Sequence, residues 1–123
     1  MNLELSEHAL DGCTVVGLHG ELDLATAPGL REHLLGVLTG QPPALILDLS
    51  GLAFMDSTGL NVLLGAKRHA GLLGIPFALA APQKIPARVL RITGLNRHFT
   101  IYPTAAEAVA DAGGRPGSAI ATA

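Results

Sequence analysis

Residues 44–59 read ALILDLSGLAFMDSTG and join an apolar run to the start of a helix. The run Ala44–Leu49 is nearly continuous in apolar side chains, which is typical of a central strand buried on both faces of a sheet. After Asp56-Ser57-Thr58-Gly59, apolar residues recur along one side of a helix that should end between Gly71 and Gly74. A buried strand that leads directly into a helix is the repeating step of an α/β layer structure.

Upstream of this stretch, the sequence predicts a hairpin and a helix. Short strands are expected at Leu3–Leu5 and Thr14–Gly20, with the turn signal Asp11-Gly12 between them. Thr26 is expected to cap a helix that carries leucines along one face and ends near Gly40. An antiparallel hairpin should therefore precede the first helix.

Downstream, the pattern of a strand followed by a helix continues twice. Apolar runs at Ile75–Ala80 and Phe99–Tyr102 have the length and composition of strands. A helix is expected at Ile85–Ile92, and a capping box that begins at Thr104 predicts a last helix through about Ala112. The order β-β-α-β-α-β-α-β-α predicts an α/β fold with a mixed, mostly parallel sheet of about five strands and about four α-helices.

The chain has 123 residues, which suits one domain with one modest hydrophobic core. We expect this domain to span residues 1–112. Residues 113–123 consist of Gly, Ala, Pro, Ser and Thr with one Arg and one Ile. A tail of this composition buries too little apolar surface to order itself, so we expect it to be disordered.

Composition narrows the classes of partner. The formal net charge is -2, so no basic nucleic-acid-binding face is expected. The longest uncharged stretches, 34–47 and 70–83, are shorter than the roughly 20 apolar residues of a spanning helix, so direct membrane insertion is not expected. The acidic N-terminus lacks the basic region of a signal peptide. The single cysteine, Cys13, fits a reducing compartment, and a cytoplasmic location is expected.

Ser57 stands where the buried strand gives way to a helix. In a structural interpretation its hydroxyl caps the helix, since serine is a preferred N-cap residue. In a functional interpretation Ser57 is a phosphorylation site, because a helix N-terminus tolerates the added charge of about −1.5 to −2. A partner carboxylate about 6 Å from the phosphate would be repelled by roughly 2–4 kcal/mol. The phosphate would then act at an interface and not on the fold.

Gly20-Glu21-Leu22-Asp23 is a second polar cluster, between a predicted strand and the first helix. Its simplest interpretation is a solvated loop. In an alternating α/β sheet, the loops that follow parallel strands gather at one edge. We therefore predict that the loop with Asp23 and the turn with Ser57 are neighbours.

These motifs together resemble STAS domains, and specifically the stand-alone anti-sigma factor antagonists of bacteria. The resemblance extends from about residue 3 to residue 112. Four segments carry it: GELD at 20–23, LILDLSGL at 45–52, FMDSTGL at 54–60 and TAAEA at 104–108. Their order and spacing make the resemblance specific, although each segment alone is short.

The resemblance implies a binding protein that is not an enzyme and needs no cofactor. In this family the serine at the position of Ser57 is phosphorylated by a partner that is both an anti-sigma factor and an ATP-dependent serine kinase. The unphosphorylated antagonist binds this partner and releases the sigma factor, and a serine phosphatase reverses the modification. Ser57 is the expected acceptor, with Thr58 as the alternative, and Asp23, Asp56 and Gly59 complete the expected partner-binding surface.

Two other classes of function compete with this one. Catalysis by Ser57 is disfavoured, because the sequence lacks the G-x-S-x-G elbow, a Walker-type phosphate loop and histidines at metal-ligand spacing. A STAS adaptor subunit of a lipid-transport ABC complex, without phosphoregulation, stays open because such subunits share the fold. A homodimer also stays open, since 49% of the residues are hydrophobic.

Overall fold

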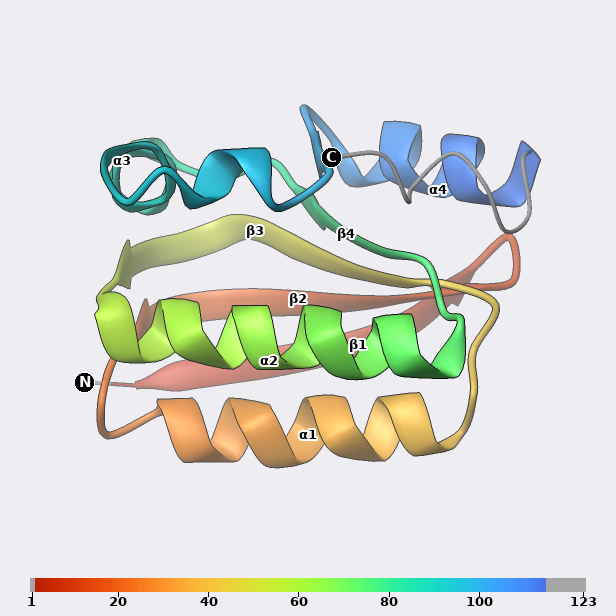
Figure 1. The fold of residues 1–123 in the computed structure, drawn as a ribbon, viewed down its shortest axis with the longest axis horizontal. Coiled ribbons are helices and arrows are strands. Elements are labelled where there is room, and N and C mark those ends of the chain that lie inside the picture. Colours follow the sequence, from red (N-terminus) through yellow and green to blue (C-terminus); the bar gives the residue numbers. More distant parts are fainter. Residues whose placement is uncertain (1, 115–123) are drawn as a thin grey trace.

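A five-stranded sheet with helices on its faces forms the structure, a computed structural model that describes residues 2–114 (Figure 1). The predicted α/β class and the mixed sheet are confirmed. The part of the predicted tail from residue 115 onward lies outside the described residues. The elements are β1 (Leu3–Leu10), β2 (Cys13–Leu22), α1 (Ala27–Thr39), β3 (Leu45–Met55), α2 (Ser57–Leu73), β4 (Phe77–Ala80), α3 (Lys84–Ile92), the 3-10 helix η1 (Leu95–Arg97), β5 (Ile101–Tyr102) and α4 (Ala105–Gly114).

The strands lie in the order of the chain, β1-β2-β3-β4-β5. β1 pairs with β2 in antiparallel orientation, and every later pair is parallel. The predicted hairpin turn is confirmed: Asp11 and Gly12 have φ of 50° and 85°, the left-handed pair that a tight hairpin requires.

β2 and β3 are both longer than the sequence predicts. The parallel ladder continues past two register shifts and pairs Leu22 with Met55 at its end. Gly20, with φ of 117°, lets β2 bend at one of these shifts. The interpretation of Glu21 and Leu22 as loop residues is therefore wrong: both belong to β2, and of this cluster Asp23 alone lies beyond the strand.

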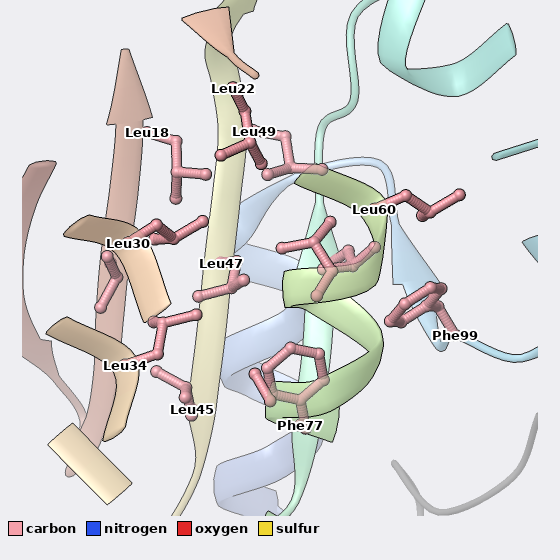
Figure 2. Close-up of a cluster of buried hydrophobic side chains, with 14 of the residues drawn as sticks. Leu18, Leu22, Leu30, Leu34, Leu45, Leu47, Leu49, Leu60, Phe77 and Phe99 are labelled. Carbon is pink, nitrogen blue, oxygen red and sulfur yellow. The ribbon is translucent and has the colours of Figure 1, made fainter. Parts of the chain in front are cut away.

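The core has two layers because successive strand residues point to opposite faces of the sheet. On one face, Leu45 and Leu47 of β3 lie in a cluster with the leucines of α1 and α2. On the other face, Ile46 packs with Val109 of α4. Figure 2 shows Leu30 and Leu34 of α1 pointing toward β2 and β3. β3 is thus buried on both faces, as its apolar run predicts.

Two local features also agree with the sequence. α2 ends at Gly74, which has φ of 71° and whose N–H donates to the carbonyls of Ala70 and Gly71. Cys13 is a buried strand residue, and burial together with the Asp11 carboxylate raises the pKa of its thiol. Cys13 therefore packs as a small apolar side chain. None of the helices within residues 2–114 is long and apolar enough to span a bilayer.

Candidate functional site

The β2–α1 loop and the β3–α2 turn lie side by side where β2 and β3 end. Leu22 is the parallel partner of Met55, and the Asp56 N–H donates to the Leu22 carbonyl at 3.2 Å. The predicted proximity of the Asp23 loop and the Ser57 turn is confirmed. The register of the two central strands places them together.

Asp56, and not Ser57, caps α2. Asp56 has an extended backbone (φ −106°, ψ −174°), and its Oδ1 accepts from the Gly59 N–H at 3.0 Å. Ser57 is the first helical residue, so the structural interpretation of Ser57 as the cap is wrong. The Ser57 side chain is exposed, and no hydrogen bond to its hydroxyl is found within residues 2–114. Its hydroxyl is therefore accessible to a second protein.

Replacing the cap tests this assignment. Asp56→Ala removes the acceptor for the Gly59 N–H and should lower the free energy of unfolding by about 0.5–2 kcal/mol. Asp56→Ser keeps a capping oxygen and should stay close to wild type. Urea denaturation followed by circular dichroism measures both. Equal midpoints for Asp56→Ala and wild type would contradict the assignment of the cap.

The Asp23 loop is held by its own side chains. Asp23 Oδ1 accepts from the N–H groups of Ala25 and Thr26, at 3.0 and 3.1 Å. The Thr26 hydroxyl accepts from the Asp23 N–H at 2.9 Å and donates to the Glu21 carbonyl at 2.8 Å. Thr26 occupies the cap position of α1, but its side chain makes no capping bond. The prediction that its side chain caps α1 is wrong because the hydroxyl is used within the loop.

This loop presents an apolar side chain that the sequence analysis did not identify. Leu24 is 73% exposed, directly after Asp23. In the sequence, the sign of this feature is a large apolar residue within a short polar segment between a strand and a helix. The hydrogen bonds of Asp23 and Thr26 already restrain the loop. A partner that binds Leu24 would therefore lose little free energy in ordering the loop.

Gly59 fixes how closely α2 approaches β2. A Cβ atom at this position would lie 2.4 Å from Leu22 Cγ and 3.0 Å from the Leu22 carbonyl oxygen. Gly59 is buried and Thr58 is half-buried, so neither offers much surface to a partner. The five predicted site residues lie on two adjoining segments, but their roles differ: Ser57 is accessible, Asp23 and Asp56 support the backbone, and Gly59 allows the approach.

The site contains the Ser57 hydroxyl and the carboxylates of Asp23 and Asp56. Within the described residues, no three His, Cys, Asp or Glu side chains lie close enough together to hold a metal ion. What the arrangement offers is an exposed hydroxyl at a helix N-terminus, beside a restrained loop with one exposed leucine.

The family model and the relatives with known names agree on one family. The model of the STAS domain family matches residues 5–108. The anti-sigma-F factor antagonist RsfB of Mycobacterium tuberculosis is 32% identical over 99 residues, which cover 80% of each chain. The anti-sigma-B factor antagonist of Bacillus subtilis is 33% identical over 96 residues, covering 78% of this chain and 87% of the relative.

A solved structure supports the same family. The crystal structure of an anti-sigma factor antagonist from Mycobacterium paratuberculosis superimposes with a TM-score of 0.83 at 32% identity. The match covers 90% of this chain and 94% of the other. A family model that spans most of the chain, relatives at this identity and a shared five-stranded fold agree with one another. The chain belongs to the STAS domain family.

Proposed function

We propose that this chain is an anti-sigma factor antagonist in the cytoplasm whose binding is switched off by phosphorylation of Ser57. The single observation that carries the proposal is the accessible Ser57 hydroxyl at the start of α2, made possible because Asp56 provides the cap. The names of the relatives, which are antagonists of anti-sigma-F and anti-sigma-B factors, supply the class of partner.

The unphosphorylated chain binds an anti-sigma factor that is also a serine kinase, and the sigma factor is released. In the kinase reaction, Ser57 Oγ forms a bond to the γ-phosphorus of ATP. The bond from that phosphorus to the β,γ-bridging oxygen breaks, and ADP leaves. A base on the kinase takes the hydroxyl proton, because no side chain within residues 2–114 is hydrogen-bonded to the Ser57 hydroxyl. A serine phosphatase restores the alcohol by transfer of the phosphoryl group to water.

The fold should tolerate the phosphate. Near the N-terminus of α2 the helix dipole attracts it by about 0.3–1 kcal/mol. The half-buried Asp56 carboxylate repels it, by about 1 kcal/mol for charges about 6 Å apart at the dielectric constant of water. These opposing contributions are similar in size, so phosphorylation leaves the stability of the chain nearly unchanged. Its main effect falls on a partner surface that faces the same site.

Asp23 gives a test of the binding surface beside Ser57. All hydrogen bonds that the Asp23 side chain accepts within the described residues go to Oδ1, which leaves Oδ2 for a donor on the partner. Asp23→Asn keeps an Oδ1 acceptor for the loop but removes the charge. We expect about tenfold weaker binding to the anti-sigma factor at unchanged melting temperature, because hydrogen bonds to charged groups are stronger.

Asp23→Ala serves as the comparison, measured by the same titration calorimetry and thermal unfolding. It also removes the acceptor for two backbone N–H groups and should lower stability by about 1–2 kcal/mol. Wild-type affinity in Asp23→Asn would remove the Asp23 charge from the interface.

The proposal as a whole is tested by retention from host lysate on the immobilised chain, with and without ATP. We expect an ATPase-type anti-sigma factor to be retained, to be released on addition of ATP, and to leave phosphate on Ser57 when the eluted chain is mapped by mass spectrometry. Retention of transport ATPase subunits that ATP does not release, with Ser57 unmodified, would favour the adaptor function. Phosphate found on Thr58 alone would show that Thr58, and not Ser57, is the acceptor.

A further inference from the structure

A groove runs between α1 and α2, which lie side by side on one face of the sheet (Figure 1). Its volume is about 520 Å³. Buried Leu34, Leu38 and Ala66 form its apolar floor, and the exposed Arg31 and Arg68 line its rim. An open apolar groove with cationic edges is thus part of the surface that α1 and α2 present to solvent.

The charge of the groove is one-sided. Arg31 and Arg68 line it, and no Asp or Glu is among its lining residues. This contrasts with the formal net charge of -2 for the whole chain. The helix dipole does not explain why Arg68 is basic. The dipole favours a basic residue only in the last turn of a helix, and Arg68 lies before the last turn of α2. The groove therefore favours an acidic ligand.

Gly65 keeps the groove open. It lines the groove in the interior of α2, and a Cβ atom added there would meet no atom within 4 Å. Glycine in a helix interior costs about 0.5–1 kcal/mol relative to alanine. Nothing in the packing around Gly65 requires it, whereas a side chain at this position would enter the groove.

The groove is also continuous with the Ser57 site. Thr58 and Asn61 line one end of it and Leu72, which is 81% exposed, lines the other. From Thr58 to Leu72 a helix rises about 21 Å at about 1.5 Å per residue. A protein that covers Ser57 therefore meets the groove directly, and a helix of about 14 residues matches its length.

We propose that the groove binds an amphipathic helix of the anti-sigma factor, with apolar residues on the floor and acidic residues against Arg31 and Arg68. The inference rests on the proposed function and extends it to a second contact region. A third helix laid between two packed helices buries its apolar face in the way that helix-in-groove complexes do. A second copy of the chain is a poorer occupant, because its own α1–α2 face carries the same positive charge.

The test uses the anti-sigma factor retained by the wild-type chain, purified and titrated against variants. Gly65→Leu fills the groove, and Gly36→Leu is its matched control: an added Cβ there also meets nothing, on α1 and outside the groove lining. Arg68→Glu reverses the rim charge, and Arg88→Glu on α3 is its control, because Arg88 is also exposed and also lies before the last turn of its helix. We expect Gly65→Leu and Arg68→Glu each to weaken binding about tenfold or more. The two controls should bind with affinity close to wild type, and no variant should melt appreciably below wild type, since the two glycine replacements favour the helix.

The outcomes separate the two proposals. If wild type binds the anti-sigma factor and Ser57→Asp does not, but Gly65→Leu and Arg68→Glu bind like wild type, the groove proposal is overturned and the proposed function stands. If wild type binds no anti-sigma factor, both are overturned. If sedimentation shows a wild-type dimer that Gly65→Leu converts to a monomer, the occupant is a second copy and the groove proposal is overturned.

Discussion

Ser57→Asp is expected to weaken binding to the anti-sigma factor about 100-fold while the melting temperature stays close to that of wild type. A single charge about 6 Å from a partner carboxylate costs about 3 kcal/mol at an effective dielectric near 20. Each 1.4 kcal/mol is about a tenfold change in affinity. The phosphate carries about 1.5 to 2 charges, so phosphorylation of Ser57 should weaken binding about 1,000-fold or more.

The fold should tolerate Ser57→Asp for local reasons. Ser57 is exposed and is the first residue of α2, and the capping bond to the Gly59 N–H comes from Asp56. An acidic side chain in the first turn is itself favourable to the helix dipole. Thermal unfolding of the two proteins in the same buffer measures this. A large fall in melting temperature would show that Ser57 has a structural role that the contacts do not explain.

Ser57→Ala is the matched control for the binding experiment. It adds no charge, so it should bind the anti-sigma factor with nearly wild-type affinity. It also lacks the acceptor hydroxyl, so ATP should not release it from the kinase. Titration calorimetry measures the affinities, and elution with ATP measures release. If ATP released Ser57→Ala from the kinase at the wild-type rate, the acceptor would be another residue, and Thr58 would be tested next.

Gly59→Ala and Gly65→Ala should change stability in opposite directions, although both substitutions lie in α2. At Gly59 the new Cβ would lie 2.4 Å from Leu22 Cγ, within the buried core. The Leu22 carbonyl oxygen, 3.0 Å away, belongs to backbone that accepts from Asp56 and cannot shift easily. Overpacking of this kind costs about 1–3 kcal/mol.

At Gly65 the new Cβ meets no atom, so only the backbone effect remains. Alanine there should stabilise the helix by about 0.5–1 kcal/mol. Each variant is the control for the other, because both carry the same substitution in the same helix. Urea denaturation measures the free energy of unfolding of both. If Gly59→Ala were as stable as Gly65→Ala, α2 would not be docked on Leu22 as closely as the structure shows.

The order of the strands and helices follows from the amino-acid sequence alone. The unbroken apolar run at Ala44–Leu49 predicts a strand buried on both faces, and β3 packs against α1 and α2 on one face and α4 on the other. Local turn chemistry at Asp11-Gly12 predicts the hairpin, since few residues adopt positive φ readily. The alternation of strands and helices is enough to place the loops after β2 and β3 at one edge.

The length of the central strands and the identity of the helix caps depend on how the chain folds. The extension of β2 to Leu22 depends on its pairing with Met55, more than thirty positions away, which no local pattern encodes. Asp and Ser are both good caps, so the choice of Asp56 over Ser57 follows from the backbone angle at which β3 turns into α2. That choice exposes the Ser57 hydroxyl, and the packing of α1 against α2 creates the groove beside it. The groove depends on two helices that meet in space, and the exposure of Ser57 depends on a backbone angle, so neither feature follows from a local sequence pattern.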